Sequence, residues 1–130
     1  MGLPPQLEID IEYLKSQGYD VDVCRDTTNP NRIFVIFNKY KLPKGWNMPE
    51  TNLLIITDIS YPNSKIDMFW VDQNLRLANG NTMPQNGGCF ETYNNTIWQR
   101  LSWHVQKWNP AVDNVITYLG TIDSRLSQIR

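Results

Sequence analysis

Three β-strand patterns follow one another between residues 20 and 59, separated only by turns and short loops. The segment DVDVCRD alternates apolar and polar residues, RIFVIFNKYKL is rich in β-branched and aromatic residues, and TNLLIITDI forms a third apolar run. After the proline turn in SYPNSK, the segment IDMFWV supplies a fourth short strand. Consecutive strands usually pair with each other, so the pattern predicts a four-stranded antiparallel meander.

A helix is expected before this sheet. Leu7, Ile11 and Leu14 recur at helical spacing and form one apolar stripe, and Gly18 ends the pattern. The predicted fold class is therefore α+β, with this helix preceding the meander.

The second half of the chain is expected to contain a long loop and then helices. Regular patterning fades between residues 72 and 96, which indicates a long irregular loop. In IWQRLSWHVQKW, Ile97, Leu101 and Val105 lie four residues apart, as on one face of a helix. The clearest amphipathic helix follows, with Asn109 as its predicted cap and Pro110 in its first turn.

Composition limits what such a chain can do. Its 130 residues, 41% of them hydrophobic, suit one globular domain over residues 1–130. Twelve basic and thirteen acidic residues give a net charge of -1 without a basic cluster, so neither nucleic acid nor an anionic membrane is an expected partner. No apolar run approaches the length that spans a bilayer.

Cysteine and histidine are scarce. Cys24 and Cys89 are expected to be free thiols, which suits a reducing cytoplasm. These two cysteines and the single histidine, His104, match no zinc-ligand spacing, so neither a metal nor another cofactor is expected.

The order of predicted elements, together with two short motifs, resembles the ubiquitin-conjugating-enzyme superfamily. Tyr61 and Pro62 stand where that superfamily has a tyrosine-proline turn before the fourth strand, and WNPAVDNVITYLGTI is similar to the segment that opens the helix after its active site. The segments DMFWVDQNLRLANG and WQRLSWH resemble a bacterial branch, prokaryotic conjugating-enzyme family E. Members of that branch accompany ubiquitin-like proteins, activating enzymes and isopeptidases in gene clusters.

The resemblance implies a UBC-like fold and a role in handling a ubiquitin-like modifier received from an activating enzyme, with antiphage defence as one setting. Conjugating enzymes use a thiolate that accepts the modifier's C-terminal carbonyl. Cys89, after the turn NGG, is the first candidate for this thiol. It lies nineteen residues before Trp108, further than in the superfamily, and no histidine-proline-asparagine motif precedes it. Either residues 90–107 form an insertion, or the chain lacks a thiol at the usual place.

Other side chains are candidates for supporting roles. His104 could act as a general base or replace the cysteine as nucleophile, although a packed structural histidine is the alternative. Arg100 precedes His104 by four residues, would share its helical face, and could steer a modifier's carboxylate. Three tryptophans are candidate partner contacts, with packing on the sheet as the alternative: Trp70, Trp98 and Trp103. Cys24, in a strand pattern, is expected to be structural.

Three functions are consistent with these observations. The first is transfer of a ubiquitin-like protein through Cys89, or failing it His104. The second is a catalytically silent UBC-like module that binds the modifier or its activating enzyme. The third is an unrelated α+β scaffold, because fold alone does not determine function.

Overall fold

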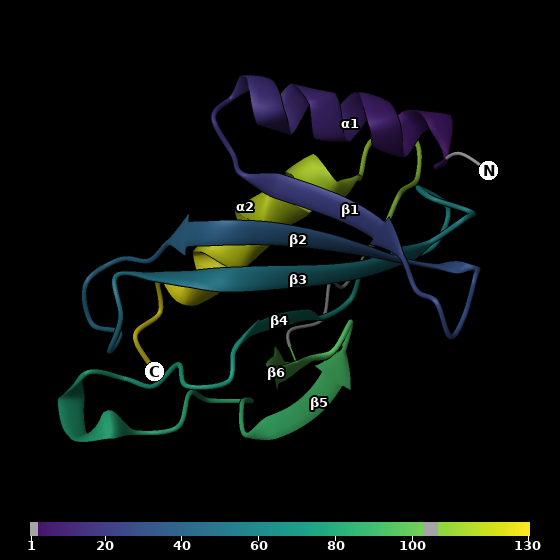
Figure 1. The fold of residues 1–130 in the computed structure, drawn as a ribbon. Helices are drawn as coiled ribbons and strands as arrows, with labels where there is room; N and C mark the ends of the chain where they lie inside the picture. Colours follow the sequence, from purple (N-terminus) through teal and green to yellow (C-terminus); the bar gives the residue numbers. More distant parts are fainter. Residues whose placement is uncertain (1–2, 103–106) are drawn as a thin grey trace.

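Two helices lie on one face of a six-stranded antiparallel sheet (Figure 1). The structure, a computed structural model, describes residues 3–102 and 107–130. The elements in chain order are α1 (Pro5–Ser16), β1 (Val21–Arg25), β2 (Arg32–Lys41), β3 (Glu50–Asp58), β4 (Phe69–Asp72), the 3-10 turn η1 (Asn79–Asn81), β5 (Cys89–Tyr93), β6 (Thr96–Leu101) and α2 (Val115–Leu126). The strands are ordered β1-β2-β3-β4-β6-β5. The α+β class is confirmed, as is the antiparallel meander of the first four strands.

The prediction of only four strands is wrong, because residues 89–101 form a β-hairpin. The sequence pattern predicts that residues 89–96 belong to the long loop and that residues 97–101 begin a helix. Asn94 and Asn95 both have positive φ, 52° and 60°, as a two-residue type I′ hairpin turn requires. β6 also pairs with β4, with Trp70 opposite Arg100. Backbone pairing on both sides of β6 therefore outweighs the four-residue spacing of its apolar residues.

The first helix forms as its sequence predicts. Leu7, Ile11 and Leu14 are buried against the sheet, and Pro5 occupies the first turn, where its missing N–H costs no helical hydrogen bond. Gly18 follows the helix with φ of 93°, and its N–H donates to the carbonyl of Lys15. Neither described helix is long and apolar enough to cross a bilayer.

The C-terminal helix begins five residues later than predicted. Asn114, not Asn109, is its cap: the Asn114 side chain accepts from the backbone N–H of Ile116 and Thr117, and the Thr117 hydroxyl accepts from the Asn114 N–H. Asn109 instead closes a turn, in which its carbonyl accepts from the N–H of Asp113. The reciprocal capping box satisfies more of the free amides at the helix start than Asn109 could. α2 is the one regular helix in the described residues after β6.

Tyr61 connects the two helices through one hydroxyl group. Its Oη donates to Asp10 Oδ2 in α1 at 2.6 Å and accepts from the backbone N–H of Val115, the first residue of α2, at 2.8 Å. The peptide bond between Tyr61 and Pro62 is cis. The carbonyl of Pro62 accepts from the indole Nε1 of Trp108 at 2.8 Å. The two short motifs of the sequence are therefore in direct contact.

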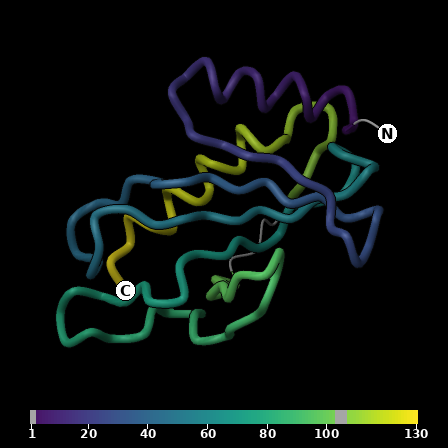
Figure 2. The backbone as a smooth tube through the Cα atoms, viewed as in Figure 1, coloured from purple at the N-terminus to yellow at the C-terminus, as the bar shows by residue number. Residues whose placement is uncertain are grey.

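The sheet has two apolar faces. The helix-covered face packs against α1 and α2 and carries the larger core, which includes Ile33, Val35, Phe37, Leu53, Ile55, Phe69 and Val71. The opposite face, here called the outer face, carries a second buried cluster of Phe34, Leu54, Trp70 and Trp98. Figure 2 shows how the green chain segment that contains β5 and β6 lies beyond β4, away from both helices.

The outer face is covered by the sheet itself. The ring of Tyr93, at the end of β5, lies 5.7 Å from that of Phe34 in β2 and 5.5 Å from that of Trp70 in β4, centroid to centroid. The Arg32 guanidinium lies 5.3 Å from the Tyr93 ring centroid. Because β2 and β5 are at distant positions in the strand order, these contacts require the sheet to curl back over its outer face.

Asp26 fixes the turn between β1 and β2 at the edge of this curl. Its carboxylate accepts from the N–H and hydroxyl of Thr28 at 2.8 and 2.7 Å, and from Nε of Arg32 at 2.8 Å. The hydrogen bonds from Thr28, followed by the interaction with Arg32, lower the pKa of Asp26 from 3.8 to about 2.

We expect Tyr61→Phe to lower the free energy of unfolding by about 1–3 kcal/mol, because it leaves Asp10 and the Val115 N–H without their shared partner. Urea unfolding followed by circular dichroism measures this change. Tyr13→Phe on the exposed side of α1 is the matched control and should stay within about 0.5 kcal/mol of wild type. Equal stability of the two variants would contradict the bridging role.

A second prediction concerns acid stability. The pKa of Asp26 is lower in the folded protein than in the unfolded chain, so its stabilising contribution is present above pH 3.8 and is lost as the pH falls through about 2. The stability difference between wild type and Asp26→Asn should therefore shrink between about pH 4 and pH 2. Thermal unfolding across this range tests it, with Glu12→Gln on α1 as control. A difference that does not depend on pH would contradict the assignment.

Candidate functional site

The candidate thiol, Cys89, is the first residue of β5 and lies on the outer face of the β5–β6 hairpin. It is partly exposed and is the cross-strand partner of Arg100 in β6, which in turn is opposite Trp70 in β4. Side chains of directly opposite residues lie on the same face of a sheet. Cys89, Arg100 and Trp70 thus form one row across three strands.

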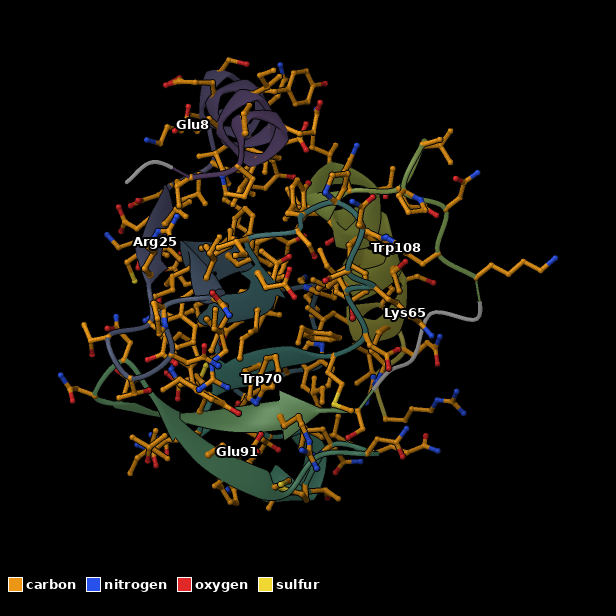
Figure 3. All side chains as sticks on the ribbon, turned by 90° about the vertical axis from the view of Figure 1, so that its right-hand side faces the viewer. Glu8, Arg25, Lys65, Trp70, Glu91 and Trp108 are labelled. Atoms are coloured by element: carbon orange, nitrogen blue, oxygen red, sulfur yellow. The ribbon has the colours of Figure 1, made fainter. Side chains whose placement is uncertain are left out.

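Glu91 holds this row together. Its Oε1 accepts from the indole Nε1 of Trp70 at 2.8 Å, and its Oε2 lies 3.5 Å from Nη1 of Arg100. Figure 3 shows Trp70 and Glu91 side by side on the strands. The Nε of Arg100 is buried and has no hydrogen-bond partner among the described residues. The Arg100 side chain is anchored by Glu91 and is still 30% exposed, so a partner's carboxylate or carbonyl oxygen could approach it from solvent.

The turn before Cys89 is held by a residue that sequence reasoning missed. Gln99 is fully buried and accepts from the N–H of Gly88 at 3.1 Å through Oε1. Its Nε2 donates to the carbonyl of Leu75 at 3.1 Å and, at 3.5 Å, to that of Asp72. Gly87 leaves no room for a side chain, because a Cβ there would lie 2.5 Å from the Gln99 Oε1. Gln99 thereby fixes the backbone that presents Cys89. This role depends on the position of Gln99 opposite Phe90 in the hairpin, which the sequence pattern does not indicate.

The same turn is also tied to the end of α2. Arg125, which is buried, donates from Nη2 to the carbonyl of Gln85 at 2.9 Å and to that of Arg130 at 2.8 Å. Its guanidinium lies 5.9 Å from the ring centroid of Trp46, whose Nε1 donates to the carbonyl of Leu126. A basic residue in the last turn of the C-terminal helix thus positions the segment leading to Cys89, a link that no sequence motif indicates.

Trp70 and Trp98 are buried, with 8% and 4% of their surface exposed. Both pack in the outer-face cluster, so a partner would reach them only through the residues that cover them. Both tryptophans therefore pack on the sheet, as the alternative interpretation of the sequence predicts. A role in binding a partner stays a prediction. The sequence predicts that Arg100 shares a helical face with His104. This is wrong for Arg100, because this residue lies in strand β6.

Of the remaining candidate residues, Cys24 is described by the structure, whereas His104 and Trp103 are not. Cys24 is half-buried on β1, and burial, followed by the charges of Asp22 and Asp26, raises the pKa of its thiol and disfavours the thiolate. His104 and Trp103 lie outside the described residues, so their predicted roles are not tested. The interval between Cys89 and Trp108 contains the rest of β5 and all of β6, and both alternatives for the position of the thiol stay open.

Fold and site together define an α+β protein with a partly exposed thiol beside a guanidinium, at the end of its sheet away from the helices. The chain matches the family model described as prokaryotic E2 family E over residues 6–129, nearly its whole length. It belongs to this family and is a bacterial E2-like, that is, ubiquitin-conjugating-enzyme-like, protein. No curated protein and no solved structure shows significant similarity to it.

We expect Gln99→Met, which keeps the side-chain size but removes all hydrogen bonds of the amide group, to lower the free energy of unfolding by about 1–3 kcal/mol. It should also speed exchange of the Gly88 amide hydrogen, which loses its acceptor. Hydrogen exchange followed by NMR measures this, with exposed Gln73→Met as control. Unchanged protection at Gly88 would show that Gln99 does not fix the turn.

Proposed function

We propose that this protein accepts a ubiquitin-like modifier from an activating enzyme and carries it as a thioester on Cys89. Membership of the prokaryotic E2 family supports the general role. The observation that carries the specific proposal is the placement of Cys89: a partly exposed thiol, opposite Arg100, behind a turn that Gln99 and Arg125 hold in place. A rigid first residue of a strand is a suitable platform for a nucleophile, because its position is fixed before the partner arrives.

The proposed step is a transthioesterification. The Cys89 thiolate attacks the carbonyl carbon that joins the modifier's C-terminus to a cysteine of the activating enzyme. The new carbon–sulfur bond forms as the old one breaks, and the activating enzyme's thiolate departs and recovers the proton that Cys89 gave up. Arg100 would stabilise the negative charge that develops on the carbonyl oxygen. His104 remains the predicted base for this step.

Several finer features belong to the same proposal. A UBC-like arrangement is supported by the helix that precedes the sheet, the four-strand meander and the contact between Pro62 and Trp108. Two free thiols suit the reducing cytoplasm. Defence against phage stays a prediction from the family resemblance.

One observation favours the silent binding module instead. Glu91 already engages Arg100 and Trp70, so part of the polar chemistry around Cys89 is used within the protein. In that function the outer end of the hairpin contacts the modifier or the activating enzyme without forming a covalent bond.

The two functions make different predictions in a loading assay with a cognate activating enzyme, its modifier and ATP. Transfer through Cys89 should give an adduct that thiol reductant removes, that Cys89→Ala abolishes, and that Cys89→Ser converts to a reductant-resistant ester. Cys24→Ala is the control and should load like wild type, since burial raises the pKa of the Cys24 thiol and disfavours its thiolate. Mass spectrometry identifies the modified side chain.

Other outcomes of this assay are equally informative. An adduct that survives Cys89→Ala and disappears in His104→Ala would transfer the nucleophile's role to the imidazole. Binding of the modifier without any adduct would establish the silent module. If the protein neither binds the modifier nor forms an adduct with it, both proposed functions are wrong.

A further inference from the structure

The outer edge of β5 is open. β5 is the last strand in the order β1-β2-β3-β4-β6-β5, so among the described residues it has a neighbour on one side only (Figure 1). In a hairpin with a two-residue turn, the residues that flank the turn form a hydrogen-bonded pair and the pairs then alternate. Tyr93, Glu91 and Cys89 therefore bond to β6, while the N–H and C=O groups of Phe90 and Thr92 point toward the open edge.

This edge is flanked by apolar side chains. Phe90 in β5 and Ile97 in β6 lie on the hairpin face opposite to Cys89 and are 44% and 47% exposed. Met83, also exposed, lies near Gly88, where the edge begins. An added strand would find backbone partners along β5 and, on one face, the exposed ring of Phe90, which is the pattern of β-strand addition.

We infer that β5 binds the extended C-terminal tail of the ubiquitin-like modifier as a seventh, antiparallel strand; this inference rests on the proposed function. The direction of the added strand relative to β5 decides whether the tail's C-terminus lies near the thiol. A tail antiparallel to β5 enters beside Tyr93 and ends beside Cys89, whereas a parallel tail ends beside the turn at Asn94, away from the thiol. Neighbouring strands are about 4.8 Å apart, so the antiparallel tail brings its terminal carbonyl next to Cys89, with Arg100 one strand further across the sheet.

The charge on β5 argues against a second copy of this chain as the occupant. If two β5 strands paired about a twofold axis through their centres, the two Glu91 side chains would lie opposite each other on the outer face. Like charges at directly opposed positions destabilise a strand pair. A charged residue in the middle of an edge strand is also a common protection against self-association.

The test uses a peptide of about the last ten residues of the cognate modifier, with a free C-terminus, binding to the whole protein. Thr92→Pro removes one outward N–H without removing a bond to β6, and it should weaken binding about tenfold. Thr92→Val, which keeps the N–H and a branched side chain, is the matched control and should bind within about twofold of wild type. Equal affinity of the two variants would overturn the inference.

A second measurement protects the test against misfolding of the proline variant. In the wild-type protein, the peptide should slow exchange of the Phe90 and Thr92 amides, while the Glu91 amide, already bonded to β6, changes little. Protection of Phe90 and Thr92 without peptide, together with a dimeric mass, would assign the edge to a second copy and overturn the inference. A modifier that loads onto Cys89 while its tail protects neither amide would leave the proposed function standing and the tail site wrong.

Discussion

The apolar outer face of β2 and β3 is the constraint on which the rest of this structure depends. Phe34 and Leu54 project from that face, on the side of the sheet that neither helix covers. Left in water, such side chains would each forgo about 1.5–3 kcal/mol of burial free energy. The chain resolves this by adding a hairpin beyond β4 and curling it back, so that Tyr93 and Trp98 complete the cluster. The curl is therefore a packing requirement that also positions the site.

Cys89 owes its surroundings to this arrangement. The hairpin that covers Phe34 with Tyr93 carries Cys89 at its other end, opposite Arg100. Buried polar contacts then fix the approach to the thiol from two directions, through Gln99 within the hairpin and through Arg125 from α2. Buried hydrogen-bonding groups of this kind are costly to leave unpaired, so they hold the turn in one conformation. The thiol is presented on an edge strand that pairs with β6.

A buried polar group also fixes the position of the two helices relative to each other. One hydroxyl, that of Tyr61, satisfies a carboxylate in α1 and the first free amide of α2. The indole of Trp108 donates to the carbonyl of Pro62 and so holds the Tyr61–Pro62 turn. Trp108 is labelled in Figure 3. The two segments that carry the family resemblance thus contact each other and connect the helices to the sheet.

The sequence by itself determined the α+β class, the first helix, the first four strands and the family, because these depend on local periodicity and on short motifs. Only the tertiary structure decided the rest. Residues 97–101 carry a spacing that fits a helix, and pairing with β4 and β5 makes them a strand. Asn109 and Asn114 are both competent caps, and the capping box with Thr117 selects the second. The roles of Gln99, Glu91 and Arg125 at the candidate site arise from contacts across 11, 21 and 40 residues of chain, which periodicity cannot encode.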